Sequence, residues 1–159
     1  MARFTDNMLA TADWLAQASS PLGSAALRRS VSTSYYTLFS RLAVLCAERI
    51  ARAAPTSDSF RSVYRAIDHG HARSVLLGHK EFSLPLGENF RRLQEARYWA
   101  DYSIESHPES AKANAGRRFT RLEARQFVSL AADSLRFIDA LPPDAKQRLA
   151  VTLVTRSRR

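Results

Sequence analysis

The sequence predicts an all-α fold, an up-and-down helical bundle of five to six helices with one long central helix. Three observations favour it. Glycine and proline number only five and six in 159 residues, which is few for a turn-rich β fold. Apolar residues recur at helical spacing in successive segments. The segment 22–53 contains no proline and carries apolar residues on two sides, as a helix with neighbours on both sides does.

The predicted helices begin at capping residues and end at proline or glycine. The first is expected to start after Thr5, the third after Ser57 or Asp58, and Gly70 is expected to break the third. The main helices are predicted at 5–19, 22–53, 57–67, 88–104, 120–141 and 143–155, with a short helical piece at 71–78.

Three segments lack helical periodicity. Residues 80–89, KEFSLPLGEN, are expected to form a loop, 106–118 a long mobile loop, and 156–159 a basic tail. In the helix at 120–141, the apolar positions predict an inward face. Its members are Leu122, Phe127, Leu130, Ala131, Leu135 and Ile138.

Composition places the chain among ordinary globular proteins. Apolar residues make up 45% and charged residues 25%, which suits one helical domain spanning 1–159. No apolar run reaches the roughly 18 residues that span a bilayer, and the first residues lack the apolar stretch of a secretory signal. Cys46 is the only cysteine, so no internal disulfide can form and a cytoplasmic location is expected.

The chain is strongly basic. Lys plus Arg total 24 against 15 acidic residues, a net charge of +9, and most of the basic residues are Arg. Arginine forks match phosphate oxygens and stack on bases, so this charge favours a nucleic-acid partner. The alternative is that a high-GC genome enriched arginine codons without any such function.

Two polar features stand out on predicted helices. The central helix begins with a cluster of hydroxyls, in the stretch from Ser30 to Tyr36. In the helix at 88–104, Arg97 falls on the apolar stripe and Asp101 follows it by one turn, so the two side chains are neighbours. We expect the hydroxyls to face this pair across the bundle. The result is either a polar binding pocket or a closed network that only fixes helix register.

These two stretches resemble the HEPN-domain superfamily. Arg28 to Phe39, RRSVSTSYYTLF, is similar to that superfamily's R-x6-Y-Y-A-x-F helix, and Leu93 to Tyr102 resembles the L-x3-R-x2-A-D-Y element of its small uncharacterised bacterial and archaeal branch. The helix containing Ala124, Phe127 and Leu135 fits the closing helix of that branch. The resemblance covers about 9–141.

The resemblance implies a helical bundle that is commonly a homodimer. Many such proteins are RNases or toxins of toxin–antitoxin and defence systems, some beside a nucleotidyltransferase or antitoxin partner, and others bind RNA or nucleotides without cleavage. The nuclease members carry Arg and His separated by four to six residues. Arg97 has no such His, and Asp101 stands near its place. The expected function is therefore a non-catalytic RNA- or nucleotide-binding module, with an RNase toxin or a helical protein-interaction module as alternatives.

Other routes to catalysis are weaker. Arg65 and His71 match the nuclease spacing but lie on another helix, where His69 and His71 are expected to be surface histidines. The spacing of these histidines and His79 does not predict a metal site. No glycine-rich phosphate loop predicts a cofactor, and Cys46 on an apolar stripe predicts inert packing.

The remaining candidates are binding residues. With Arg97, Asp101, Tyr102 and Tyr36, the set expected to contact RNA or a nucleotide includes Arg29, Ser32, Arg92, Arg117 and Arg118; Arg28, Arg91, Arg121 and Arg125 are further basic positions. Their alternative is a solvated basic face. Tyr98 and Trp99, beside Arg97, either stack on a base or pack in a dimer interface, and we expect the interface.

Overall fold

The computed structural model of the chain is all-α and describes residues 2–18, 23–103 and 118–155. Within these ranges there are no strands; there are seven α-helices, more than the five to six expected, and two single-turn π-helical segments. The helices are α1 (Ala2–Ala16), α2 (Gly23–Cys46), α3 (Asp58–Arg65), α4 (His69–Gly78), α5 (Glu88–Tyr102), α6 (Arg121–Ala140) and α7 (Pro143–Val154). The π-helical segments are η1 (Ala47–Ala51) and η2 (Ser83–Gly87).

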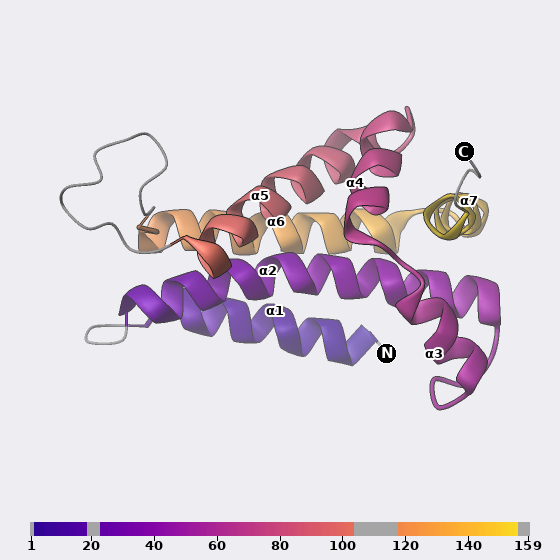
Figure 1. The fold of residues 1–159 in the computed structure, drawn as a ribbon, viewed down its shortest axis with the longest axis horizontal. Coiled ribbons are helices and arrows are strands. Elements are labelled where there is room, and N and C mark those ends of the chain that lie inside the picture. Colours follow the sequence, from indigo (N-terminus) through magenta and orange to yellow (C-terminus); the bar gives the residue numbers. More distant parts are fainter. Residues whose placement is uncertain (1, 19–22, 104–117, 156–159) are drawn as a thin grey trace.

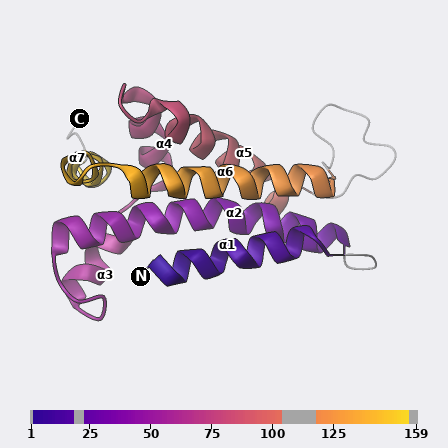
Figure 2. The same cartoon turned by 180° about the vertical axis from the view of Figure 1, so that it is seen from behind.

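The long helix α2 lies at the centre, as its two apolar sides predicted. Figure 1 shows α1 and α2 side by side along the long axis, with α5 crossing above them and α7 running across one end. Seen from behind, α6 lies along α2 (Figure 2). Because neighbours surround most of α2, most of its residues are buried, including Ser30, Ser34 and Thr37.

The core is continuous along α2 and falls into two clusters. The larger one joins Tyr35, Leu38 and Leu42 to residues of α5, α6 and α7. The smaller one, at the opposite end of α2, packs Leu27 and Val31 against Ala12, Ala100 and Phe119, among others. Cys46 lies in the larger cluster and is fully buried, and burial raises the pKa of its thiol to about 12. The Cys46 side chain therefore serves to pack the core, as its position on an apolar stripe indicated.

Several helix starts follow local capping chemistry. Ser57 caps α3 by accepting a hydrogen bond from the Phe60 amide, and Thr120 forms a capping box with Glu123 at the start of α6. Thr5 does not cap α1, because that helix begins upstream at Ala2 and Thr5 is buried within it.

The predicted position of the break between α3 and α4 was wrong. Gly70 lies inside the first turn of α4, and the chain instead leaves α3 at Ala66 and re-enters a helix at Asp68. The Asp68 side chain accepts the His71 amide at 2.8 Å and so starts α4 at His69. The stabilisation of a helix start by a carboxylate cap is larger than the destabilisation caused by one glycine in the first turn.

Two other expectations need correction. Residues 80–89 are not simply a loop, since η2 occupies part of them and α5 begins at Glu88. Leu122 points outward and is 68% exposed, while Ala124 and Val128 occupy the buried positions of that end of α6. The expected mobile loop and basic tail fall almost wholly outside the described residues. In the described residues no helix is both long and apolar enough to cross a bilayer.

Candidate nucleotide-binding site

Arg97 is the centre of a polar cluster between α2 and α5. Its Nη2 donates to the Tyr36 hydroxyl at 2.6 Å and to the Tyr102 hydroxyl at 3.3 Å, and its Nε lies 2.9 Å from Asp101 Oδ2. The Arg97 and Asp101 side chains are each 21% exposed. The expectation that the start of α2 faces this pair is confirmed for Tyr36.

Aromatic rings surround the same guanidinium. Its Cζ lies 5.9 Å from the ring centre of Tyr35, 5.3 Å from that of Tyr36 and 5.2 Å from that of Tyr102. Ring faces attract a cation, most strongly where water is excluded. Burial disfavours the charged form of Arg97, but the hydrogen bond to Tyr36 and the adjacent charges outweigh it, so its pKa is raised. The site therefore holds a permanent cation in a fixed position.

The small hydroxyls of α2 do not join this cluster. Ser34 and Thr37 donate to carbonyls one turn earlier in α2, and Ser30 donates to the Ala12 carbonyl of α1 at 2.7 Å. Ser32 lies on α2 between Arg28 and Tyr36, which both contact α5. It is only 1% exposed, and its hydroxyl has no hydrogen-bond partner. A ligand at the surface would not reach it.

His69 is a member of the cluster that the sequence did not indicate. It is half-buried at the start of α4, with its ring stacked 3.9 Å from the ring centre of Phe39 and its Nδ1 2.5 Å from the Tyr35 hydroxyl. Burial, followed by the charge of Arg97, lowers the pKa of His69. Burial likewise raises the pKa of Tyr35, so both groups are neutral near pH 7. The expectation of surface histidines is wrong, since His71 is half-buried as well.

Local sequence contained one signal for His69. Asp68 followed by a helical pattern is a capping signature, and it would have started α4 at His69 instead of ending a helix at Gly70. The contacts with Tyr35 and Phe39 are tertiary, and no local pattern reports them. The other match to the nuclease spacing does not form a site, since no hydrogen bond or ion pair joins Arg65 to His71 in the described residues.

The basic residues predicted from sequence divide into two groups. Arg28 is structural, because its Nε donates to the Ala100 carbonyl at 2.8 Å and its Nη2 contacts the Trp99 and Ser103 carbonyls. Arg91 is paired with Glu88 and Glu95. Arg29 is exposed and makes no ion pair with a described residue.

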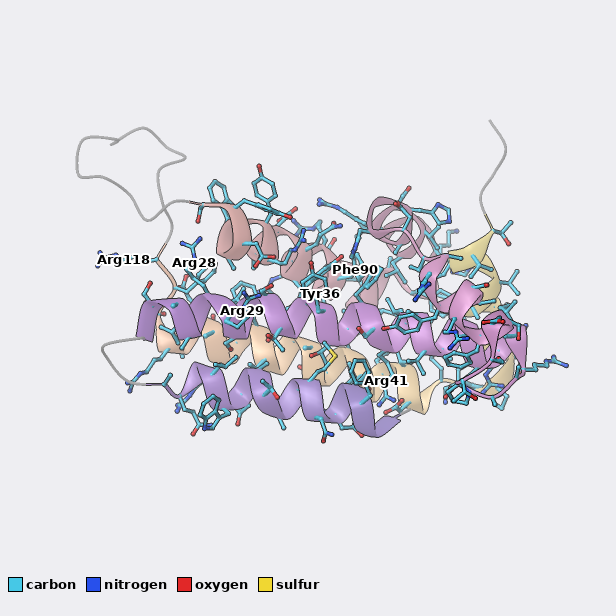
Figure 3. All side chains as sticks on the ribbon, turned by 60° about the horizontal axis from the view of Figure 1, so that its bottom comes forward. Arg28, Arg29, Tyr36, Arg41, Phe90 and Arg118 are labelled. Atoms are coloured by element: carbon cyan, nitrogen blue, oxygen red, sulfur yellow. The ribbon has the colours of Figure 1, made fainter. Side chains whose placement is uncertain are left out.

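Position decides which of the free arginines can act with Arg97. Arg29 lies on the same face of α2 as Tyr36, about two turns earlier, and its neighbour Arg28 contacts the end of α5. Figure 3 shows Arg28, Arg29 and Arg118 toward one end of the molecule and Tyr36 nearer the middle. Arg92 is turned about 140° around α5 from Arg97, so it lies on another face. Arg117 is outside the described residues.

Comparisons with known proteins add no relative to this geometry. No family model matches the chain, and neither curated proteins nor solved structures gave a match. The site must therefore be interpreted from its own chemistry.

A second polar hollow lies at the other end of α2. It has a volume of about 100 Å³ and is lined by residues that include Arg41, Arg49, Asp139 and Lys146. Arg41 is already paired with Asp6 at 3.4 Å and Asp139 at 3.1 Å, and Lys146 donates to the Asp139 carbonyl. These contacts tie α1, α2, α6 and α7 together, which is a structural role. No cluster of metal-ligating side chains occurs among the described residues.

Proposed function

We propose that this protein is an HEPN-like module that binds RNA or a nucleotide through the Arg97 site without cleaving it. The observation that carries the proposal is the placement of Arg97, a fixed and partly exposed cation whose remaining surface is bordered by tyrosine rings. Phosphate is the group that a guanidinium fork binds best, and rings beside it suit a base.

Charge supports the same proposal. The net charge of +9 attracts polyanions, and Arg29 adds an unpaired cation on the α2 face that carries Tyr36. Asp101 lowers the net charge of the site through its ion pair with Arg97, while the Tyr36 hydroxyl holds the guanidinium by a hydrogen bond. A homodimer, a nucleotidyltransferase or antitoxin partner, and a toxin–antitoxin or defence role stay predictions from the resemblance.

The test is RNA binding by an Arg97→Ala variant. Loss of one charge-assisted phosphate contact should weaken RNA binding about tenfold or more. The affinity of Arg97→Lys should lie between those of wild type and Arg97→Ala, because lysine keeps the charge but not the guanidinium fork. Fluorescence anisotropy with labelled RNA and with a labelled mononucleotide gives the dissociation constants. Circular dichroism checks that each variant is folded.

The matched control is Arg136→Ala. Arg136 is exposed on α6 and paired with Asp133, so this variant loses the same charge elsewhere. Equal binding by wild type and Arg97→Ala, or an equal loss in Arg136→Ala, would show that Arg97 is not the binding site.

RNA cleavage is a second candidate function, favoured by His69. This imidazole is neutral near pH 7 and neighbours two of the three tyrosines around Arg97, Tyr35 and Tyr36. A neutral imidazole can take the proton of an attacking 2′-hydroxyl while a guanidinium stabilises the charge on the phosphate. The structure thus brings to Arg97, from α4, the residue type that is missing from the positions after it in α5.

The two candidates are separated by incubating the protein with RNA in chelator. Cleavage that is lost in both Arg97→Ala and His69→Gln but kept in His71→Gln, a control two residues along α4, would establish the nuclease. If RNA stays intact when the protein is saturated with it, the protein is the non-catalytic binding module.

A further inference from the structure

Two tyrosines beside the Arg97 site are exposed to solvent. Tyr98 is 59% exposed and Tyr102 is 61% exposed, and they are one turn apart on α5 with ring centres 5.4 Å apart. Tyr102 touches Arg97, and Tyr98 continues the aromatic surface outward. Trp99 turns the other way and packs against the smaller core cluster. Their ring planes are tilted by 51° to each other, so the pair forms a small, angled tyrosine platform beside a cation.

Charge along α5 is uneven. Near its start, Arg91 pairs with Glu88 and Glu95, and Arg73 of α4 also pairs with Glu95, so Arg92 is the one arginine of that half without an ion pair to a described residue. Near its end, Arg29 and Arg118 are exposed, and neither forms an ion pair with a described residue. Arg29 and Arg118 therefore place positive charge where α5 ends against the start of α2.

We propose that the ligand of this site is single-stranded nucleic acid, with one unpaired base stacked on Tyr102, a neighbouring base on Tyr98, and successive phosphates held by Arg97 and Arg29. This inference rests on the proposed function and names its substrate class. Exposed rings next to cations are what single-strand binding uses, because every base offers a ring face whatever its sequence.

The geometry disfavours two other nucleic-acid ligands. A duplex hides the faces of its bases, so it could not use the tyrosine platform, and the paired start of α5 offers it few cations. A single mononucleotide would leave Arg29 unused, since seven residues of helix separate Arg29 from Tyr36, about 10 Å along the axis. A strand of two or more nucleotides reaches both arginines.

The experiment compares a short single strand, the matching duplex and a mononucleotide by anisotropy, using the full chain. The single strand should bind at least about tenfold more tightly than either. Tyr102→Leu should weaken single-strand binding about fivefold or more, the effect of losing one base stack, and Tyr102→Phe should bind nearly as well as wild type because the ring remains. Trp14→Leu, which removes a ring 72% exposed on α1, is the control and should bind like wild type.

Salt dependence provides an independent readout. Two phosphate contacts on a single strand predict that the logarithm of the binding constant falls against the logarithm of salt concentration with a slope of about −1.4. Arg29→Met should lower the magnitude of that slope by about half. A slope several times steeper would mean a broad basic surface and would overturn the two-phosphate site.

The outcomes separate this inference from the proposed function. If Arg97→Ala weakens binding but duplex binds as well as single strand, or Tyr102→Leu binds like wild type, the single-strand inference fails and the Arg97 site stands. If no nucleic acid binds in an Arg97-dependent manner, both fail. Concentration-dependent dimerisation that disappears in Tyr98→Ala and Tyr102→Ala, without any nucleic-acid effect, would assign the platform to a second copy of the chain instead.

Discussion

Arg97 differs from the other ion-paired arginines of α5 in how its contacts are distributed. Arg91 pairs with Glu88 and Glu95 on its own helix, and such exposed pairs contribute little to stability. Arg97 also pairs with Asp101 of its own helix, but in addition it bonds to Tyr36 of another helix and is enclosed by three rings. Its position is thereby fixed before any ligand arrives, and the entropy of ordering it is not lost on binding.

At the same scale, His69 should make stability depend on pH. Its pKa in the folded chain lies below the ordinary value of 6.5, so the unfolded chain binds the proton more readily. The stabilising contribution is present above that value and is lost as pH falls through the folded pKa. Between about pH 7.5 and pH 5, wild type should therefore lose more free energy of unfolding than His69→Gln.

Urea unfolding at the two pH values measures this difference. The other histidines are the same in both proteins, so their effects cancel, and carboxylates stay largely ionised above about pH 5. Identical pH dependence in wild type and His69→Gln would mean that His69 titrates as a solvated group, and its contact with Tyr35 would not persist in solution.

At the scale of elements, α5 is held at both ends by specific contacts. Before its start, Gly87 packs so closely on α4 that a Cβ there would lie 2.8 Å from the Leu76 carbonyl oxygen. At its end, Arg28 of α2 bonds to the Trp99, Ala100 and Ser103 carbonyls. A cation is the favourable partner for the unpaired carbonyls at a helix C-terminus.

Arg28 and Arg29 are adjacent in sequence but should have separable effects. Arg28→Met keeps much of the side chain and removes the bonds to α5, so it should lower the free energy of unfolding by about 1–3 kcal/mol. Arg29→Met, the matched control on the exposed face, should change it by less than about 0.5 kcal/mol. Urea denaturation measures both. Equal stability of the two variants would show that the capping contacts are not formed in solution.

At the scale of the whole molecule, the helices were predictable because each depends on local periodicity and capping. The apolar positions Phe90, Leu93, Ala96 and Ala100 of α5 are buried, and so is Cys46, as its apolar stripe predicted. Leu122 was wrong because it lies on the face of α6 opposite to that of Ala124 and Val128, which are buried. The predicted number of helices was also too low, because the Asp68 cap extends the short piece expected at 71–78 into a full helix, α4.

The candidate site was predictable only in part. Arg97, Asp101 and Tyr36 could be brought together because a charged pair on an apolar stripe needs polar partners, and tyrosine can reach across a helix interface. The hydroxyls of Ser30, Ser34 and Thr37 instead donate hydrogen bonds to nearby backbone carbonyls. The sequence alone does not show which acceptor such a hydroxyl will use. His69 comes from a separate helix whose packing angle is set by the whole core, so no spacing rule could have located it.

The double anchoring of α5 has a kinetic consequence. If α5 binds nucleic acid as we propose, its backbone is already immobilised and needs no rearrangement, so free and bound structures should superimpose closely. Complex formation then depends on diffusional encounter, accelerated by the positive field of the chain, and differences in affinity among variants should appear as differences in residence time.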